Sequence, residues 1–490
     1  MTGFETRVRR MARGSPSNVR SAAVLLGAAA ILAGCVVGPE FRAPQPPAEQ
    51  AYVAGPNTDI GAGSDRGQHV ALGQALQADW WVLLESPELN RVVEQALADN
   101  WSIDSARANL ARATEAVAVA RGGLYPQIDA TANAGRTQYG ASFLGPQAST
   151  FPIFSAYSAG GAIRYDPDAF GGTKRGVELA KARATVQREA LNAARLDVSG
   201  SAVMMVLQIA SVRAQIDVVQ DILSSDQQTL DLVHGARAAG VASQMDVTTA
   251  QSQWDRDRTL LPPFNQQLAV AQDALAVLTG HSPVQWNAPA FTLENMTLPH
   301  ELPLAVPSEL VRDRPDIRAA EANLHAANAA VGVATADLYP RITLSGSMAE
   351  EGLLTNGPAG AAWSLLGGIT APIFHGGALS AQRSAAQEAY RSAFALYQQT
   401  VLTSFEQVAD TLHALDNDAQ SVHTEEQALA SANAALRLTR LGYGAGNAGI
   451  VQVLDAQRLQ QLAELGLVQA RAQRYVDTVR LFLAAGGGFK

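Results

Sequence analysis

The sequence is poor in cysteine, in charge and in long apolar runs. One cysteine in 490 residues cannot form an internal disulfide. After residue 35 there is no run of about 18 uninterrupted apolar residues, the length that a membrane-spanning helix needs. Hydrophobic residues make up 47% of the chain and charged residues 17%, which is too apolar for disorder and too polar for a bundle of membrane helices. Any membrane crossing must therefore use strands.

Patterns of catalytic chemistry are missing as well. The histidines show no metal-ligand spacing, and no nucleophile elbow or Ser/His/Asp set stands out. Gly444-x-Gly446-x-x-Gly449 fits the dinucleotide fingerprint, but no strand precedes it. The formal net charge is −9 and becomes more negative without the arginine-rich first 34 residues. We therefore expect no enzyme, no metal, no cofactor and no nucleic-acid partner.

The N-terminus has the features of a processing segment. Residues 1–34 combine a basic region with an apolar stretch, Ala22 to Leu32, that is too short to span a membrane. They end in Leu32-Ala33-Gly34-Cys35, which resembles the lipobox of bacterial lipoproteins. This resemblance implies a covalent diacylglycerol and an N-acyl chain on Cys35, and Val36 resembles a signal for sorting to the outer membrane. A buried structural cysteine is the alternative.

The chain contains two similar copies of one unit. Leu124-Tyr125-Pro126 recurs as Leu338-Tyr339-Pro340, and Phe170-Gly171-Gly172 recurs as His375-Gly376-Gly377. Further matches keep the same order with nearly the same offset: Gly240 with Gly446, Val247 with Val453, and Gly280 with Gly486. Chance would not preserve this colinearity. We predict a signal peptide (1–34), an N-terminal extended segment (35–87), a first repeat (88–280), a linker (281–307), a second repeat (308–486) and a tail (487–490).

Each copy predicts the same series of elements. A helix (88–121 and 315–338) ends at the Leu-Tyr-Pro, because proline breaks helical hydrogen bonding. Two runs of alternating apolar and polar residues then predict a β-hairpin (about 126–168 and 341–373). After the Gly-Gly a helical hairpin follows (173–279 and 378–485), with a first arm of about 65 residues, or about 100 Å. Pro262-Pro263 should break the first returning helix.

Four strands cannot close a membrane barrel. Strands in a bilayer must leave no unpaired edge, and known barrels begin at about eight strands. Several chains must therefore share one barrel; three chains would give twelve strands, and their long helices could assemble into a tube. Trp363, Tyr165, Phe154 and Tyr139 would then suit the aromatic girdles at the bilayer interfaces. Soluble hairpins that pack on the helices are the alternative.

Together these features resemble one family. The lipobox, the duplicated Leu-Tyr-Pro, the paired Gly-Gly, Arg314-Pro315-Asp316-Ile317-Arg318 and the segment from Tyr443 to Gln457 are similar to those of TolC-like outer-membrane efflux lipoproteins of the OprM/NodT type. The resemblance implies an α+β membrane protein: a homotrimer with a twelve-stranded outer-membrane β-barrel, four strands from each chain, continued by a periplasmic α-helical barrel. It also implies docking with a periplasmic adaptor (membrane fusion) protein and an inner-membrane RND pump.

The same resemblance places a gate at the tips of the helical hairpins. Asp455 matches an aspartate that rings the constriction, and Asp246 and Tyr443 match positions that hydrogen-bond across neighbouring hairpins. Gln452 is a departure, because TolC has a second gate aspartate there. A ring of carboxylates repels itself, binds cations and responds to protonation. Helix capping or surface solvation is the alternative for Asp246 and Asp455. The hairpin turns and the adaptor contact are expected at Gly240, Gly444 and Gly446.

The implied function is the outer-membrane channel of a tripartite RND-type efflux system. Such a channel would export small molecules such as drugs or toxic compounds, and would be lipid-anchored in the outer membrane and extend into the periplasm. Two alternatives stay open: the exit channel of a type I protein secretion system, and a non-channel coiled-coil lipoprotein that acts as an adaptor. The four alternating strands disfavour the adaptor, and the lipobox favours efflux. The sequence does not identify the cargo.

Overall fold

The computed structural model describes residues 36–53, 59–61, 67–138, 153–354 and 359–488. Cys35 and Tyr139, two of the residues singled out above, lie outside the described residues. The chain divides into two compact units. The first, which we call the sheet unit, comprises residues 1–43, 111–185 and 322–395; the second, the hairpin unit, comprises residues 44–110, 186–321 and 396–490.

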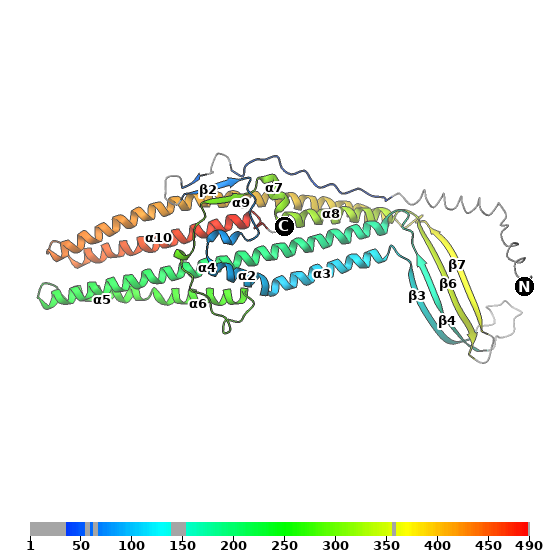
Figure 1. Cartoon of the computed structure of the whole chain (residues 1–490), viewed down its shortest axis with the longest axis horizontal. Coiled ribbons are helices and arrows are strands. Elements are labelled where there is room, and N and C mark those ends of the chain that lie inside the picture. Colours follow the sequence, from blue (N-terminus) through cyan, green and yellow to red (C-terminus); the bar gives the residue numbers. More distant parts are fainter. Residues whose placement is uncertain (1–35, 54–58, 62–66, 139–152, 355–358, 489–490) are drawn as a thin grey trace, which may run out of the picture. The chain divides into compact units, whose positions relative to one another are not determined.

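Helices and strands follow one another in the same order twice along the chain (Figure 1). The first series is α2 (Pro87–Asp99), α3 (Trp101–Gly122), β3 (Gln127–Thr137), β4 (Phe154–Tyr165), α4 (Gly172–Ala238), α5 (Gln244–Arg258) and α6 (Leu261–Leu278). The second is α7 (Pro307–Asp313), α8 (Pro315–Ala336), β6 (Arg341–Leu353), β7 (Gly360–Thr370), α9 (Ala378–Gly444) and α10 (Ile450–Ala484). Three short strands lie outside these series: β1 (Asp59–Ile60), β2 (Gln68–Leu72) and β5 (Glu301–Leu304).

The expected first helix, 88–121, is wrong as a single element. It is two helices, α2 and α3, separated at Asn100, whose backbone is extended. The Asn100 side chain accepts a hydrogen bond from the Ser102 backbone N–H (2.9 Å) and donates one to the Leu278 carbonyl (2.9 Å). Asparagine suits this position because its side chain satisfies an N–H group that a helix start leaves free. The predicted break at Pro262-Pro263 is confirmed, since α5 ends at Arg258 and α6 starts at Leu261.

The sheet unit contains one four-stranded antiparallel sheet in the order β3-β4-β6-β7 (Figure 1). Its register places Ile128, Ile163, Gly346 and Leu365 in one row across the four strands, and Ala130, Gly161, Met348 and Trp363 two residues along. The rows that alternate with them carry mostly polar side chains: Gln127, Arg164, Ser345 and Leu366 in one, and Asp129, Ala162, Ser347 and Ser364 in the next. Since paired residues share a face, one face of the sheet is predominantly apolar, with Glu350 as an exception near the loop end, and the other is predominantly polar.

None of the described residues covers the apolar face of this sheet. Trp363 is 78% exposed and Leu365 is 77% exposed, and every residue of β3 and β7 is exposed. Within the described residues, no strand pairs with the outer edge of β3 or of β7. The described part of the chain therefore leaves both an apolar surface and two backbone edges uncovered.

The hairpin unit has a conventional buried core. The largest cluster includes Trp80, Trp81, Leu84 and Phe482, with Trp80 5.8 Å from Phe482 between ring centroids. Among the described residues one helix, α4, has an 18-residue window long and apolar enough to cross a membrane, and 61% of that window is buried inside the chain. Burial of this kind is typical of a core helix, so the apolar window is explained by packing.

Candidate gate at the hairpin tips

Each helical hairpin turns at a glycine in the left-handed region. Gly240 has φ +78° and Gly446 has φ +76°, values that residues with a side chain rarely adopt. Helix α9 continues through Gly444. Of the three predicted turn glycines, Gly240 and Gly446 therefore lie in the turns, and Gly444 is the last residue of the helix.

The returning helices begin with equivalent caps. In α5 the Ser243 backbone N–H donates to Asp246 Oδ2 (2.7 Å), and the Asp246 N–H donates to Ser243 Oγ (3.2 Å). In α10 the Gly449 N–H donates to Gln452 Oε1 (2.8 Å). The Ser243 backbone N–H and hydroxyl, both donating to the carboxylate, lower the pKa of Asp246. Asp246 and Gln452 thus hold the same position, and capping is one role of each.

Tyr443 lies at the end of α9 against an apolar cluster shared by the two hairpins. The cluster contains Leu230 and Val233 of α4, Val247 and Ala250 of α5, Leu436 of α9, and Ile450, Val453, Leu454 and Ala456 of α10. Burial raises the pKa of Tyr443, and the negative charge of Asp246 raises it further. The charge of Asp246 therefore acts on Tyr443 within one chain, and their hydrogen bond across neighbouring hairpins stays a prediction.

Asp455 lies one turn further along α10 and faces solvent. Its side chain is 67% exposed, and its contact with Arg458 is long, at 3.9 Å between NH2 and Oδ1. An exposed pair at this distance contributes little to stability, typically below about 1 kcal/mol. The carboxylate is therefore available for a partner outside the chain.

A buried polar network lies beneath the apolar cluster, and the sequence did not reveal it. Gln457, 1% exposed, donates to Asp226 Oδ1 (2.7 Å) and to Ser225 Oγ (3.0 Å). Gln461 also donates to Asp226 Oδ1 (3.2 Å), and Arg440 donates to Ser225 Oγ (2.7 Å). Since Asp226 belongs to α4 while Arg440 and Gln457 belong to α9 and α10, the network joins the two hairpins.

Asp226 shares this network with a second buried carboxyl group, that of Asp257 on α5. Burial raises the pKa of Asp226 to about 7, and the hydrogen bond and charge of Asp257 add to the effect. Asp226 Oδ2 is buried and has no hydrogen-bond partner among the described residues. Two adjacent carboxyl groups with few other donors are stable when they share one proton. Asp418 and Asp477 form a similar pair in the second hairpin, where the pKa of Asp418 is also raised to about 7, by burial and then by Asp477.

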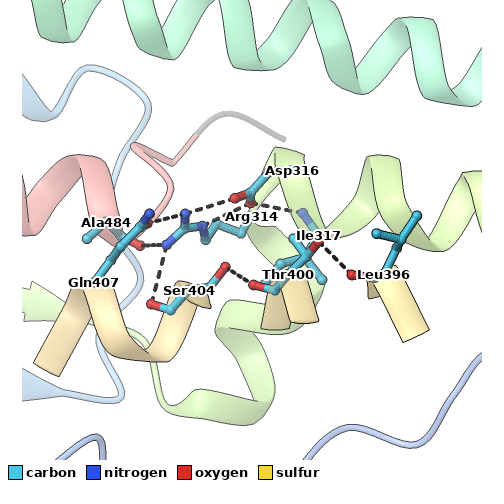
Figure 2. Close-up of polar contacts among 8 residues, drawn as sticks. All are labelled: Arg314, Asp316, Ile317, Leu396, Thr400, Ser404, Gln407 and Ala484. Carbon is cyan, nitrogen blue, oxygen red and sulfur yellow. Dashed lines mark hydrogen bonds and ion pairs between the residues drawn. The ribbon is translucent and has the colours of Figure 1, made fainter. Parts of the chain in front are cut away.

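The Arg314 segment, part of the family resemblance, is a structural anchor in the hairpin unit (Figure 2). Arg314 is buried and donates to the Ala484 carbonyl (2.9 Å) and to Gln407 Oε1 (2.6 Å). It also contacts both oxygens of Asp316, at 2.9 and 2.8 Å. Arg314 therefore ties the start of α8 to α9 and to the end of α10. It takes no direct part in the tip.

Comparisons with known proteins agree with this arrangement. The family model of the outer membrane efflux proteins matches residues 92–281 and 306–487. The chain is 30% identical to outer membrane protein OprJ of Pseudomonas aeruginosa over 94% of each chain. It is also 30% identical to the pyoverdine export outer membrane protein OpmQ of the same species, over 86% of this chain and 90% of that one.

A solved structure shows the same fold. The outer-membrane channel OprN superimposes with a TM-score of 0.82 at 26% identity, covering 93% of this chain and all of that one. The resemblance to TolC-like outer-membrane factors is thereby confirmed. This is a family of transport channels and not of enzymes. The chain belongs to the outer membrane efflux protein family and is the outer-membrane component of an efflux system.

Proposed function

We propose that three copies of this chain form one channel that carries small molecules across the outer membrane in a tripartite RND-type efflux system. The observation that carries the proposal is the four-stranded sheet of the sheet unit. It has one apolar face, one predominantly polar face and two unpaired edges among the described strands. Three such sheets joined edge to edge give a twelve-stranded barrel with its apolar face toward lipid and its polar face toward a water-filled lumen.

The order of the elements supports an internal two-fold repeat. Helices α4 and α9 are both 67 residues long, and α3 and α8 are both 22 residues long. Each of α3 and α8 precedes a β-hairpin, and each of α4 and α9 follows one. Six such repeats around one axis would continue the barrel as a tube of helices in the periplasm.

A lipid anchor on Cys35 is consistent with the contacts of the residues that follow it, Val37 and Gly38. The Val37 N–H donates to the Phe170 carbonyl (3.1 Å), and Arg175 donates to the carbonyls of Val37 and Gly38 (both 3.2 Å). The segment that follows Cys35 is therefore held beside the end of β4 and the start of α4. Acyl chains on Cys35 would enter the bilayer next to the barrel, as a secondary anchor.

We place the gate at the hairpin tips. Three copies of Asp455 around a narrow opening would repel one another and attract cations. The Asp246 and Tyr443 pair would hold neighbouring hairpins in the closed state, and the two Gly turns would meet the periplasmic adaptor. An amide at Gln452 leaves the constriction with less charge than a second ring of carboxylates would give it.

The proposal is tested by purifying the full chain from outer membranes. We expect native mass spectrometry to show three chains, and planar-bilayer recordings to show a channel whose conductance rises when Asp246→Ala or Tyr443→Phe is introduced. A chain that leaves the membrane on urea washing and gives no conductance would refute the channel. Deletion should raise accumulation of dyes or drugs in cells; normal accumulation combined with loss of a secreted protein would instead indicate type I secretion.

A further inference from the structure

Within the sheet unit the two repeats meet at one junction, and the corresponding surfaces on the other side of each repeat are exposed. Inside the sheet unit, β4 of the first repeat pairs with β6 of the second, from Ala156↔Leu353 to Tyr165↔Leu344. The Phe170 ring stacks on Tyr339 with centroids 4.9 Å apart and planes at 25°. Close backbone approach completes the junction, because a Cβ on Gly172 would lie 3.2 Å from Ala336 Cβ.

The corresponding surfaces are the end of α3 and the start of α9, and both are exposed. Eight of the fifteen residues of α8 from 322 to 336 are buried, but only one of the twelve residues of α3 from 111 to 122 is buried. No residue of α9 from 378 to 395 is buried, whereas Arg175, Val177 and Ala182 are buried on the matching part of α4. In the sheet unit these helix segments are therefore buried mainly where the two repeats meet.

Sequence matching identifies the residues that would face each other across a second copy. The Phe-Gly-Gly and His-Gly-Gly segments align Phe170 with His375, and the two Leu-Tyr-Pro segments align Tyr339 with Tyr125. Tyr125 is 68% exposed, and His375 is exposed too. In the same alignment Gly172 and Ala336 become Gly377 and Gly122, two residues that allow an even closer backbone approach.

We propose, building on the homotrimer of the proposed function, that a second copy of this chain covers these surfaces. The segment Pro372–His375 and the start of α9 of one protomer pack against the end of α3 of the next, and His375 stacks on Tyr125 of the neighbouring copy. The contact reproduces the Phe170–Tyr339 stack of the intrachain junction. It also covers Ile373 and Phe374, which are 90% and 86% exposed in the single chain.

One difference between the two junctions supports the assignment. The segment after Cys35 lies only on the intrachain junction, where Arg175 donates to its backbone and Phe41 stacks on His325 at 4.3 Å. We call the proposed contact between two copies the seam. The aligned residues there are Ser380 in place of Arg175 and Ala111 in place of His325, neither of which can make these contacts. A chain with one N-terminal segment needs its binding residues at one junction only, and the two junctions differ accordingly.

The test uses cysteine pairs in the full-length chain, treated in outer membranes with a short bifunctional maleimide. We expect His375→Cys with Tyr125→Cys to give two-chain and three-chain bands on denaturing gels. The matched pair Phe170→Cys with Tyr339→Cys should cross-link within one chain and leave its mass that of a single chain. Each single variant controls for Cys35, and His375→Cys with Thr137→Cys, at the far end of β3, should give no ladder.

The outcome distinguishes failure of the proposed seam contact from failure of the proposed channel function. If native mass spectrometry shows three chains and the Phe170/Tyr339 pair reacts, a His375/Tyr125 pair that stays monomeric overturns the seam and leaves the proposed function standing. Single chains in native mass spectrometry would overturn both. An independent readout is the temperature at which the trimer separates: His375→Phe should raise it and His375→Ala should lower it, and no change in either variant would also overturn the contact.

Discussion

Replacing Asp226 with asparagine removes a proton-dependent contact beneath the proposed gate. The pKa of Asp226 is about 7 against an ordinary 3.8, a difference of about three units, and each unit corresponds to about 1.36 kcal/mol. Between about pH 4 and 7 the folded chain holds a proton that the unfolded chain has lost, so stability falls as pH rises through this range. The limit of that loss is about 4 kcal/mol, which rearrangement and water entry will reduce to roughly 2 kcal/mol.

An asparagine can accept hydrogen bonds from Gln457 and Gln461 as the carboxyl does, and its amide can donate to Asp257 at any pH. We therefore expect the local stability of Asp226→Asn to equal that of wild type near pH 4 and to exceed it near pH 9. Hydrogen exchange of α4 and α5 around these residues, corrected for intrinsic rates, measures this directly. Asp231→Asn, an exposed change in the same helix, is the control. Wild-type protection that is equal at both pH values would refute the shared proton.

Three further changes test other parts of the chain. Leu365→Arg, on the apolar face of the sheet, should destabilise the membrane-inserted assembly by about 2–4 kcal/mol in urea unfolding, whereas Ser364→Arg on the polar face should cost well under half of that. Arg314→Met should cost roughly 2 kcal/mol or more in unfolding free energy, because it leaves the Ala484 carbonyl without its donor. Asp455→Asn should lower cation selectivity in bilayer recordings with unchanged unfolding; equal selectivity would remove Asp455 from the gate.

Periodicity predicted most of the secondary structure because its causes are local. The Leu-Tyr-Pro segments end helices by removing a hydrogen-bond donor, and the alternation after each proline has only one regular interpretation. The sheet register then placed Ile128, Ile163 and Leu365 in one row, as the alternation required. The break at Asn100 was missed because one of the two partners of its side-chain amide, the Leu278 carbonyl, is 178 residues away. The helical pattern of the sequence continues on both sides of Asn100 and therefore does not indicate the break.

The buried network could not be predicted for a related reason. Asp226, Gln457 and Gln461 lie on helices rich in polar residues, and the same residue types on an exposed face would give the same pattern. Their burial depends on the two hairpins being side by side, a contact between residues more than 200 positions apart. Asp226 is thus indistinguishable in sequence from exposed Asp231. Asp246, Tyr443 and Asp455 were found by resemblance, and their part in gating remains a prediction.

Comparison of the two hairpin turns separates capping from charge at Asp246. Asp246 and Gln452 occupy the same position in their returning helices, and each side-chain oxygen accepts from the backbone N–H three residues earlier. Capping of this kind requires an acceptor and works with either a carboxylate or an amide. Capping therefore explains why this position has a side-chain oxygen, but it does not explain why that side chain is a charged carboxylate. That charge raises the pKa of Tyr443 of the other hairpin, so Asp246→Gln, which keeps an acceptor, should spare the fold of the turn and still weaken the contact that we propose holds the channel closed.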